Sequence, residues 1–181
     1  MNAINFLVKT LFDIYLMLVL IRAWLQIARA DFYNPFSQFV VKVTHPFVGP
    51  LRRVIPSIAS WDLATIFFAF VVACLKVLTL TMIMNALFNW QVILISGVIV
   101  VITAVFKLIF WVLILRAILS WVSRGNNPIE AVMIQLSEPL LSPVRRVIPP
   151  MGGLDLSMIV VLIALQFVEY LTSDLISRFI S

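Results

Sequence analysis

The chain has 181 residues, of which 63% are hydrophobic and 12% are charged, and its mean hydropathy is +1.13. Soluble domains are about 45–50% apolar and roughly 25% charged, so this composition excludes an ordinary soluble protein. The formal net charge is +5, but the basic residues stand singly or as Arg-Arg pairs. That distribution argues against a nucleic-acid partner and favours anionic lipid headgroups.

Four apolar segments are each long enough to cross a hydrocarbon core of roughly 30 Å, which takes about 20 helical residues. They cover about residues 4–27, 63–84, 98–121 and 154–175. The sequence therefore predicts an all-α integral membrane protein with four transmembrane helices.

The first apolar segment also has features of a cleavable signal peptide. Lys9 precedes its apolar run, and the small-x-small triplet Ala28-Arg29-Ala30 follows it. A matching helix recurs at residues 98–121 without such a triplet. We therefore expect the first segment to be a retained span.

A long motif occurs twice in the chain. Asn34-Pro35 recurs as Asn127-Pro128, and Pro-x-x-x-Pro-x-Arg-Arg-Val-Ile-Pro begins at both Pro46 and Pro139. Asp-Leu follows each motif at the same offset. The duplication predicts two tandem repeats, residues 1–91 with loop 28–62 and residues 92–181 with loop 122–153. Because each repeat has two spans, both repeats enter the membrane in the same orientation.

The basic residues near the span ends predict the orientation. The two loops carry most of them, and the opposite side carries two. In the loops they are Arg29, Lys42, Arg52, Arg53, Arg124, Arg145 and Arg146, and on the opposite side they are Lys9 and Arg178. We therefore expect both loops to be cytoplasmic and both termini to lie outside.

The duplicated Pro-Arg-Arg motif between apolar spans resembles the YggT family of bacterial and plastid membrane proteins, over essentially the whole chain. The resemblance implies a protein of the bacterial inner membrane. It links relatives to cell division and nucleoid distribution, to osmotic tolerance with cation uptake, and in plastids to cytochrome complex maturation. The family has no established catalytic residues, so the resemblance implies none here.

Each loop is expected to contain a short helix. Asn34 and Asn127 are expected as N-caps, each with a proline in the first turn, and the helices are expected to stop before Pro46 and Pro139. Apolar side chains at helical spacing form one stripe on each helix, with Ser37, Gln38 and Lys42 off the first stripe. The stripes are Phe36, Phe39, Val40 and Val43, and Ile129, Val132, Met133 and Leu136.

These amphipathic helices are expected to lie in the membrane interface. Basic side chains beside them would contact lipid headgroups or partner proteins. They are Lys42, Arg52, Arg53, Arg145 and Arg146. In the alternative, the stripes pack on the protein's own helices and the arginines only fix the topology. Asp62 and Asp155 are expected to cap the second spans and to receive a guanidinium from the Arg-Arg pairs.

Four ionisable residues lie deep inside the predicted spans: Asp13, Lys76, Lys107 and Glu169. Each stands 14 residues from the loop end of its helix, about 21 Å, so all four have the same depth. Such charges are expected to pair, within a repeat or between repeats. The pairs either clamp the helices in register or line a hydrated path for cations or protons. Arg22 and Arg116, nearer the loops, are expected to snorkel.

The sequence contains no phosphate-binding glycine loop, paired histidines or nucleophile elbow, so an enzyme is not expected. His45 has no partner for a metal site and Cys74 is expected to be a small buried hydrophobe, so no cofactor or metal is expected. We expect an inner-membrane scaffold or assembly factor whose loops engage anionic lipids and membrane-protein partners. The alternative is a small ion-conducting or cation-uptake-supporting homo-oligomer that uses the deep charges.

Overall fold

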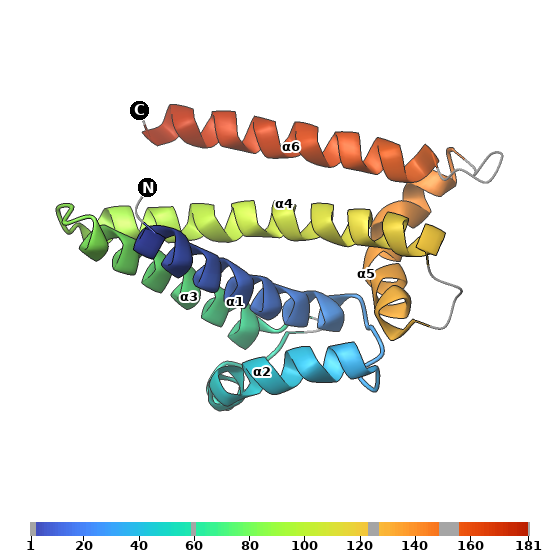
Figure 1. Ribbon diagram of the computed structural model, residues 1–181, viewed down its shortest axis with the longest axis horizontal. Coiled ribbons are helices and arrows are strands. Elements are labelled where there is room, and N and C mark those ends of the chain that lie inside the picture. Colours follow the sequence, from blue (N-terminus) through green and yellow to red (C-terminus); the bar gives the residue numbers. More distant parts are fainter. Residues whose placement is uncertain (1–2, 59–60, 123–126, 149–155, 181) are drawn as a thin grey trace. The chain divides into compact units, whose positions relative to one another are not determined.

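The structure is a computed structural model that describes residues 3–58, 61–122, 127–148 and 156–180, apart from the side chains of residues 179 and 180. Over these ranges the chain forms helices and no named strand. The helices are α1 (Ala3–Ile27), α2 (Pro35–Leu51), α3 (Leu63–Ile83), α4 (Trp90–Val122), α5 (Pro128–Arg145) and α6 (Leu156–Ile180) (Figure 1).

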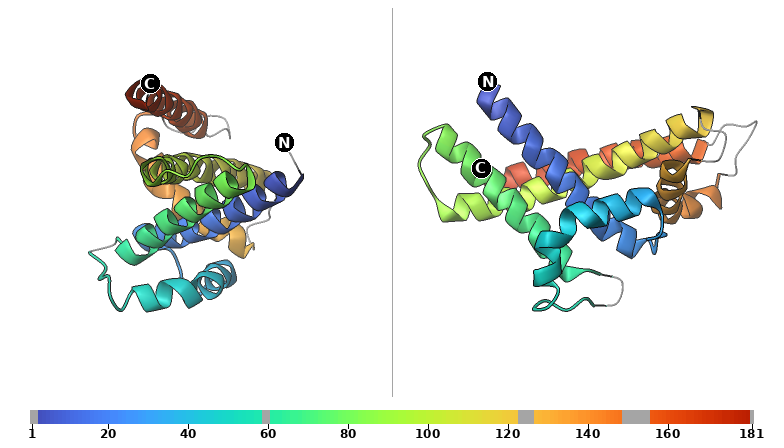
Figure 2. Two further views of the ribbon diagram at one scale, coloured as in Figure 1. Left: turned by 90° about the vertical axis from the view of Figure 1, so that its left-hand side faces the viewer. Right: turned by 60° about the horizontal axis from the view of Figure 1, so that its bottom comes forward.

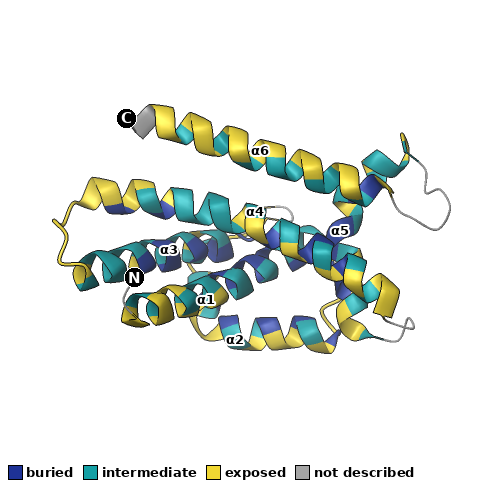
Figure 3. Ribbon diagram, turned by 45° about the horizontal axis from the view of Figure 1, so that its top comes forward, coloured by how far each residue is buried: buried dark blue, intermediate teal, exposed yellow. Residues whose placement is uncertain are grey.

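Four helices, α1, α3, α4 and α6, are long and apolar enough to cross a membrane, and they coincide with the four predicted spans. Helix α4 begins at Trp90, earlier than expected, and has 33 residues. Between 6% and 22% of the most apolar window of each helix is buried inside the chain. Figure 3 shows this exposure along α6. Because apolar surface of this kind is stable in lipid, the prediction of an all-helical multi-pass membrane protein is confirmed.

The chain divides into two compact units, residues 1–108 and 109–181, and the division falls inside α4. The first unit holds α1, α2, α3 and the first part of α4. The second holds the rest of α4 with α5 and α6. The sequence repeat is expected to change near residue 91, and that boundary stays a prediction.

In the first unit, α1 and α3 lie side by side and α2 packs against both (Figure 2). Leu16, Val19 and Leu25 of α1 are fully buried, as are Ala64 and Ala69 of α3. Small side chains let helix backbones approach closely, which is the main source of helix association in lipid. The buried alanines of α3 therefore suit its close packing in the first unit, where α1 is its main neighbour.

An aromatic cluster ties α2 to the two spans. Tyr15 of α1 meets the rings of Phe47 and Phe68 edge-on, with centroids 6.2 Å away in each case. Phe47 of α2 stacks on Phe68 of α3 at 5.6 Å. Because aromatic pairs contribute about 0.5–1.5 kcal/mol beyond their buried area, this cluster holds the second half of α2 against the spans.

The expected ends of the loop helices are wrong. Helix α2 continues through Pro46 and Pro50 to Leu51, and α5 continues through Pro139 and Pro143. A proline inside a helix removes one backbone donor and crowds the carbonyl four residues earlier, so it usually ends or bends the helix. In α2 the residues around Pro46 are held by tertiary contacts, because Thr44 and Val48 are fully buried and Phe47 joins the aromatic cluster. Packing therefore outweighs the local signal.

The buried face of α2 also differs from the expected stripe. Ser37, Val40, Thr44 and Val48 are fully buried, whereas Phe39 is 54% exposed. Ser37 was expected off the stripe and Phe39 on it. On α5 the expectation is closer, since Val132, Met133 and Leu136 are buried, with Ser137 and Leu141 beside them. Hydroxyl side chains thus take core positions in both helices.

The helix caps lie as follows. Asn34 Oδ1 accepts a hydrogen bond from the Phe36 amide at 2.9 Å, and Asn127 Oδ1 accepts one from the Ile129 amide at 3.0 Å. Asp62 caps α3 through the Thr65 amide at 3.3 Å. Asp155 lies outside the described residues. Each cap satisfies a donor that the first helical turn leaves unpaired.

The close approach of α3 and α4 in the first unit generates a testable prediction. A Cβ added at Gly97 would lie 2.5 Å from the Cys74 sulfur and 3.3 Å from the Phe70 ring. Gly97→Ala should therefore lower the free energy of unfolding by about 1–3 kcal/mol, because overpacked cores must shift. Adding Cys74→Ala should recover most of the loss. Thermal unfolding in detergent measures both effects.

Val98→Ala, at the neighbouring exposed position on α4, is the control and should change stability little. If Gly97→Ala were as stable as the wild type, the close approach at Gly97 would be wrong.

Candidate functional site

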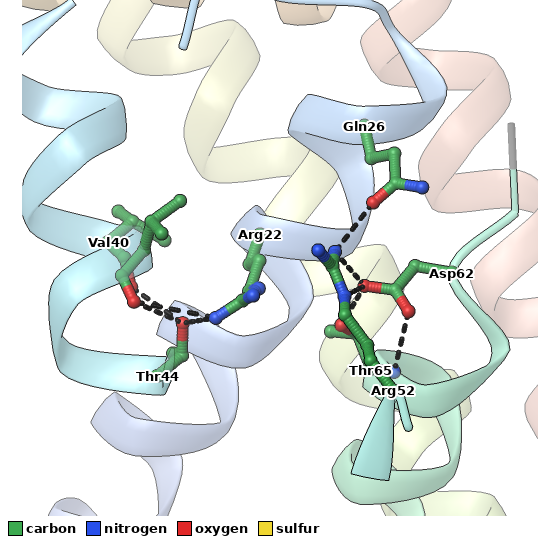
Figure 4. A network of polar contacts seen from close by, with 8 residues as sticks. Arg22, Gln26, Val40, Thr44, Arg52, Asp62 and Thr65 are labelled. Carbon is green, nitrogen blue, oxygen red and sulfur yellow. Dashed lines mark hydrogen bonds and ion pairs between the residues drawn. The ribbon is translucent and has the colours of Figure 1, made fainter. Parts of the chain in front are cut away.

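Two clusters of polar side chains stand where a first span meets its loop helix. We call them the first and second arginine junctions. The first consists of Arg22, Gln26, Thr44, Arg52, Asp62 and Thr65 (Figure 4). The second consists of Arg116, Ser137, Glu138 and Arg145. Each cluster lies within one compact unit.

In the first arginine junction, Arg22 of α1 is 2% exposed. Its Nη1 donates to Thr44 Oγ1 at 2.8 Å and to the Val41 carbonyl at 3.4 Å. Thr44 in turn donates to the Val40 carbonyl at 2.7 Å. The Nε of Arg22 is buried without a partner, and no carboxylate of the described residues forms an ion pair with this guanidinium. The predicted snorkelling of Arg22 is wrong, because α2 covers it.

Arg52, at the end of α2, holds the other side of the junction. Its Nε donates to Asp62 Oδ2 at 3.0 Å, its Nη2 also donates to that oxygen, and Nη2 donates to Gln26 Oε1 at 2.7 Å. Thr65 Oγ1 donates to Asp62 as well. Burial of Asp62 would raise its pKa, but these hydrogen bonds and the charge of Arg52 together bring the pKa below its ordinary value. Asp62 is therefore ionised at neutral pH.

A cavity of about 320 Å³ lies in the first junction. Arg22, Gln26, Phe32, Val41 and Arg52 line it. A shallower groove of about 430 Å³ shares Phe32 and Val41 with the cavity and is otherwise lined by Gln38, Lys42, His45 and Pro46. Two guanidinium groups thus face one space that continues toward a largely apolar groove.

The second arginine junction uses corresponding positions of the sequence repeat. Arg116 of α4 is 8% exposed, and its Nη1 donates to Ser137 Oγ of α5 at 2.5 Å. Ser137 donates to the Met133 carbonyl at 2.6 Å, as Thr44 does to Val40. Snorkelling of Arg116 is therefore wrong for the same reason as for Arg22.

Glu138 distinguishes the second junction from the first. Its Oε2 accepts from Nη1 and Nη2 of Arg116 at 3.3 Å, and its carboxylate accepts from Arg145 at 3.1–3.2 Å. Arg145 corresponds to Arg52 in the repeat, and Glu138 corresponds to His45. One carboxylate therefore joins the two guanidinium groups in the second junction.

The predicted contact residues divide into two groups. Lys42, Arg53 and Arg146 are exposed, whereas Arg52 and Arg145 form ion pairs with Asp62 and Glu138. Arg124 and Asp155 lie outside the described residues. Sequence reasoning missed the buried hydroxyls of Thr44 and Ser137. Their signal was present, since a hydroxyl residue stands immediately before His45 and Glu138, at corresponding places in both loop helices.

One deep pair lies within the first unit. Lys76 Nζ of α3 is 2.5 Å from Asp13 Oδ1 of α1, and the Lys76 side chain is 10% exposed. The pairing within a repeat, one of the two arrangements compatible with the sequence, is the one that the structure contains here. Lys107 and Glu169 fall in different units, and their pairing stays a prediction.

Four long apolar helices, one of which carries a lysine paired with an aspartate of another, define a multi-pass helical membrane protein. The chain belongs to the CCB3/YggT family, whose sequence profile matches residues 1–91 and again residues 95–176. The family resemblance seen in the Pro-Arg-Arg motif is thereby confirmed.

Relatives match nearly the whole chain. It is 54% identical over 178 residues to an uncharacterised protein of Vibrio alginolyticus, covering 97% of this chain and 96% of that protein. It is 46% identical over 169 residues to uncharacterised protein YggT of Escherichia coli K12, covering 93% and 88%. An uncharacterised Pseudomonas aeruginosa protein is 40% identical over 174 residues, covering 94% and 88%. No solved structure matches.

The ion pair of Asp62 generates a pH prediction. Asp62→Asn keeps a good N-cap but removes the charge that Arg52 contacts, so it should lower the free energy of unfolding by about 1–3 kcal/mol at pH 7. The pKa of Asp62 is lower in the folded protein than in the unfolded chain. The stability that the ionised Asp62 adds to the wild type is therefore complete above the ordinary aspartate pKa of about 4, and it is lost as pH falls through the lower pKa of the folded state.

Thermal unfolding in detergent from pH 7 to pH 2 tests this. The difference between the wild type and Asp62→Asn should shrink only below about pH 4. A difference that is constant over the whole range would show that the Asp62 charge contributes nothing to stability.

Proposed function

We propose that this protein is a non-enzymatic scaffold or assembly factor of the inner membrane. In this proposal the two repeats are parallel, their proline- and arginine-rich loops are cytoplasmic, and the termini lie outside. The loops engage anionic lipid headgroups and membrane-protein partners. Cell division and osmotic tolerance are the settings that the family resemblance suggests.

The proposal rests on a difference between the two arginines of each Arg-Arg pair. The first arginine of each pair forms an ion pair within the chain, Arg52 with Asp62 and Arg145 with Glu138. The second, Arg53 or Arg146, is exposed. An exposed guanidinium beside an anchored residue stays at the surface of the loop, and it can donate several hydrogen bonds to a phosphate or carboxylate.

Exposed apolar side chains beside these arginines support an interfacial position for the loop helices. Phe39 and Phe47 of α2 are 54% and 56% exposed, and Val54 and Val147 next to the arginine pairs are 81% and 80% exposed. Aromatic and apolar groups combined with basic ones are typical of helices at the headgroup level. Each basic residue near an anionic surface adds about 1 kcal/mol of attraction.

This function predicts that the exposed arginines hold lipid. The double variant Arg53→Gln, Arg146→Gln should retain fewer phosphatidylglycerol molecules per chain in native mass spectrometry of protein extracted from phosphatidylglycerol-containing membranes. About 1 kcal/mol per arginine corresponds to a roughly fivefold loss of affinity at each loop.

Lys9→Gln, Arg178→Gln is the matched control, because it removes the same charge from the side that we assign to the exterior. Equal lipid retention by the two double variants would refute a specific role for the loops. The same variants, compared by cross-linking in membranes, test capture of partner proteins.

The alternative is ion conduction by an oligomer of chains, and the deep pair is the observation that favours it. An ion pair inside a span is costly and is often functional. Asp13 and Lys76 satisfy each other at 2.5 Å, however, which suits a clamp between α1 and α3. We therefore prefer the scaffold.

If the ion pair between Asp13 and Lys76 is a structural clamp, single and double variants of the pair should differ in their free energy of unfolding. Asp13→Asn alone should cost about 1–3 kcal/mol, because Lys76 then has an unpaired charge within the span, whereas the double variant Asp13→Asn, Lys76→Met should regain most of that loss. Thermal unfolding in detergent and in nanodiscs measures both variants.

Cation flux into proteoliposomes distinguishes a structural clamp between the helices from a conducting path for ions. The scaffold predicts no flux above that of empty liposomes. Wild-type flux that disappears in the folded double variant would instead assign ion conduction to the deep charges.

A further inference from the structure

The two arginine junctions differ at one position of the loop helix, which is His45 in the first and Glu138 in the second. In the second junction, Arg116 and Arg145 share the carboxylate of Glu138. The corresponding arginines of the first junction are Arg22 and Arg52, and the position of Glu138 is taken by His45. The His45 ring lies along its own helix, within 3.2–3.3 Å of where a Cβ on Gly49 would stand. The first junction therefore has the two guanidinium groups without the anion that joins them.

The Arg22 charge is buried and has no ion pair among the described residues, although the charge of Asp62 acts on it from a distance. Its side chain contacts a hydroxyl and a carbonyl, and its Nε is a buried donor without a partner among the described residues. Asp62 is the nearby carboxylate, but its ion pair is with Arg52. Burying a cation without a directly paired counter-charge is unfavourable, so such a site favours an anion from outside.

The cavity of the first junction has room for this anion. Arg22 and Arg52 both line its volume of about 320 Å³. The adjoining groove adds Lys42 and His45 as polar residues and Phe32, Val41 and Pro46 as apolar ones. Arg22 stands five residues before the end of α1, about 7.5 Å along the helix, which is the depth of a headgroup and the top of its acyl chains.

We propose that the first arginine junction binds a phosphate group of an anionic phospholipid, in the place that the Glu138 carboxylate takes in the second junction. Guanidinium groups present several donors to a tetrahedral phosphate, and Arg22 Nε is available for one of its oxygens. The apolar groove would take the glycerol and upper acyl chain, which favours a lipid over soluble phosphate. This inference rests on the proposed placement of the loops at the headgroups.

His45→Glu is the test variant. It gives the first junction the residue that the second already has, so a carboxylate of the chain should occupy the cavity. Purified protein in detergent is titrated with phosphatidylglycerol, with phosphatidylcholine or with inorganic phosphate, and the melting temperature is recorded. His45→Gln is the neutral control, and Ser57→Glu, in an exposed part of the loop, carries the same charge change outside the cavity.

We expect phosphatidylglycerol to raise the melting temperature of the wild type and Ser57→Glu saturably, and phosphatidylcholine to have no such effect. His45→Gln changes the groove lining without adding a charge, so it should respond at a lower phosphatidylglycerol concentration than His45→Glu. His45→Glu should need at least a tenfold higher phosphatidylglycerol concentration than the wild type to reach half of its maximal increase in melting temperature. Without lipid, it should melt no lower than the wild type. The reciprocal variant Glu138→His should bind one additional phosphatidylglycerol in native mass spectrometry.

Three results would overturn the proposal. If the melting temperature of His45→Glu responded to phosphatidylglycerol like that of the wild type, the lipid would not bind in this cavity. A saturable response to inorganic phosphate alone would reject the lipid. If Ser57→Glu lost phosphatidylglycerol binding to the same extent, the weaker binding of His45→Glu would be due to the overall charge of the protein and not to the cavity. Failure here is distinct from failure of the proposed function, which is tested by Arg53→Gln, Arg146→Gln.

Discussion

A guanidinium buried between the first span and its loop helix is the interaction on which the rest of the structure depends. Arg22 and Arg116 stand inside apolar helices, where a bare cation would be costly. Their hydrogen bonds to Thr44 and Ser137 require these hydroxyls to face the span. The loop helix is thereby locked in rotation, and Phe39 is turned outward.

That rotation explains how the loops combine structural and contact roles. Once α2 is fixed, its C-terminal end places Arg52 on Asp62 and leaves Arg53 exposed. The same arrangement, with Glu138 as the carboxylate, orients Arg145 in the second unit. Two neighbouring residues of identical chemistry thus have different tasks, because one pairs with a carboxylate of the chain and the other faces the surroundings. Among the described residues, the carboxylate that joins both arginines of the second junction stands at the position that His45 takes in the first.

Membership of the CCB3/YggT family fixes ancestry and architecture and leaves activity open, since relatives 40–54% identical to this chain are themselves uncharacterised. The deep Asp13–Lys76 pair is satisfied within the first unit, so it needs no ion to be stable. Lys42, Arg53 and Phe39 are exposed on the described part of the first loop, and their chemistry suits lipid headgroups and partner proteins.

The sequence by itself determined what depends on local rules. The four spans follow from the length of the apolar runs, the equal depth of Asp13 and Lys76 follows from counting helical residues, and a cap at Asn34 follows from one side chain and the proline after it. Tertiary structure decided the rest. Pro46 does not end α2, Arg22 does not snorkel, and Ser37 lies inside. In each of these cases contacts with another helix outweigh a local preference of a few kcal/mol or less, and such contacts cannot be read from residue spacing.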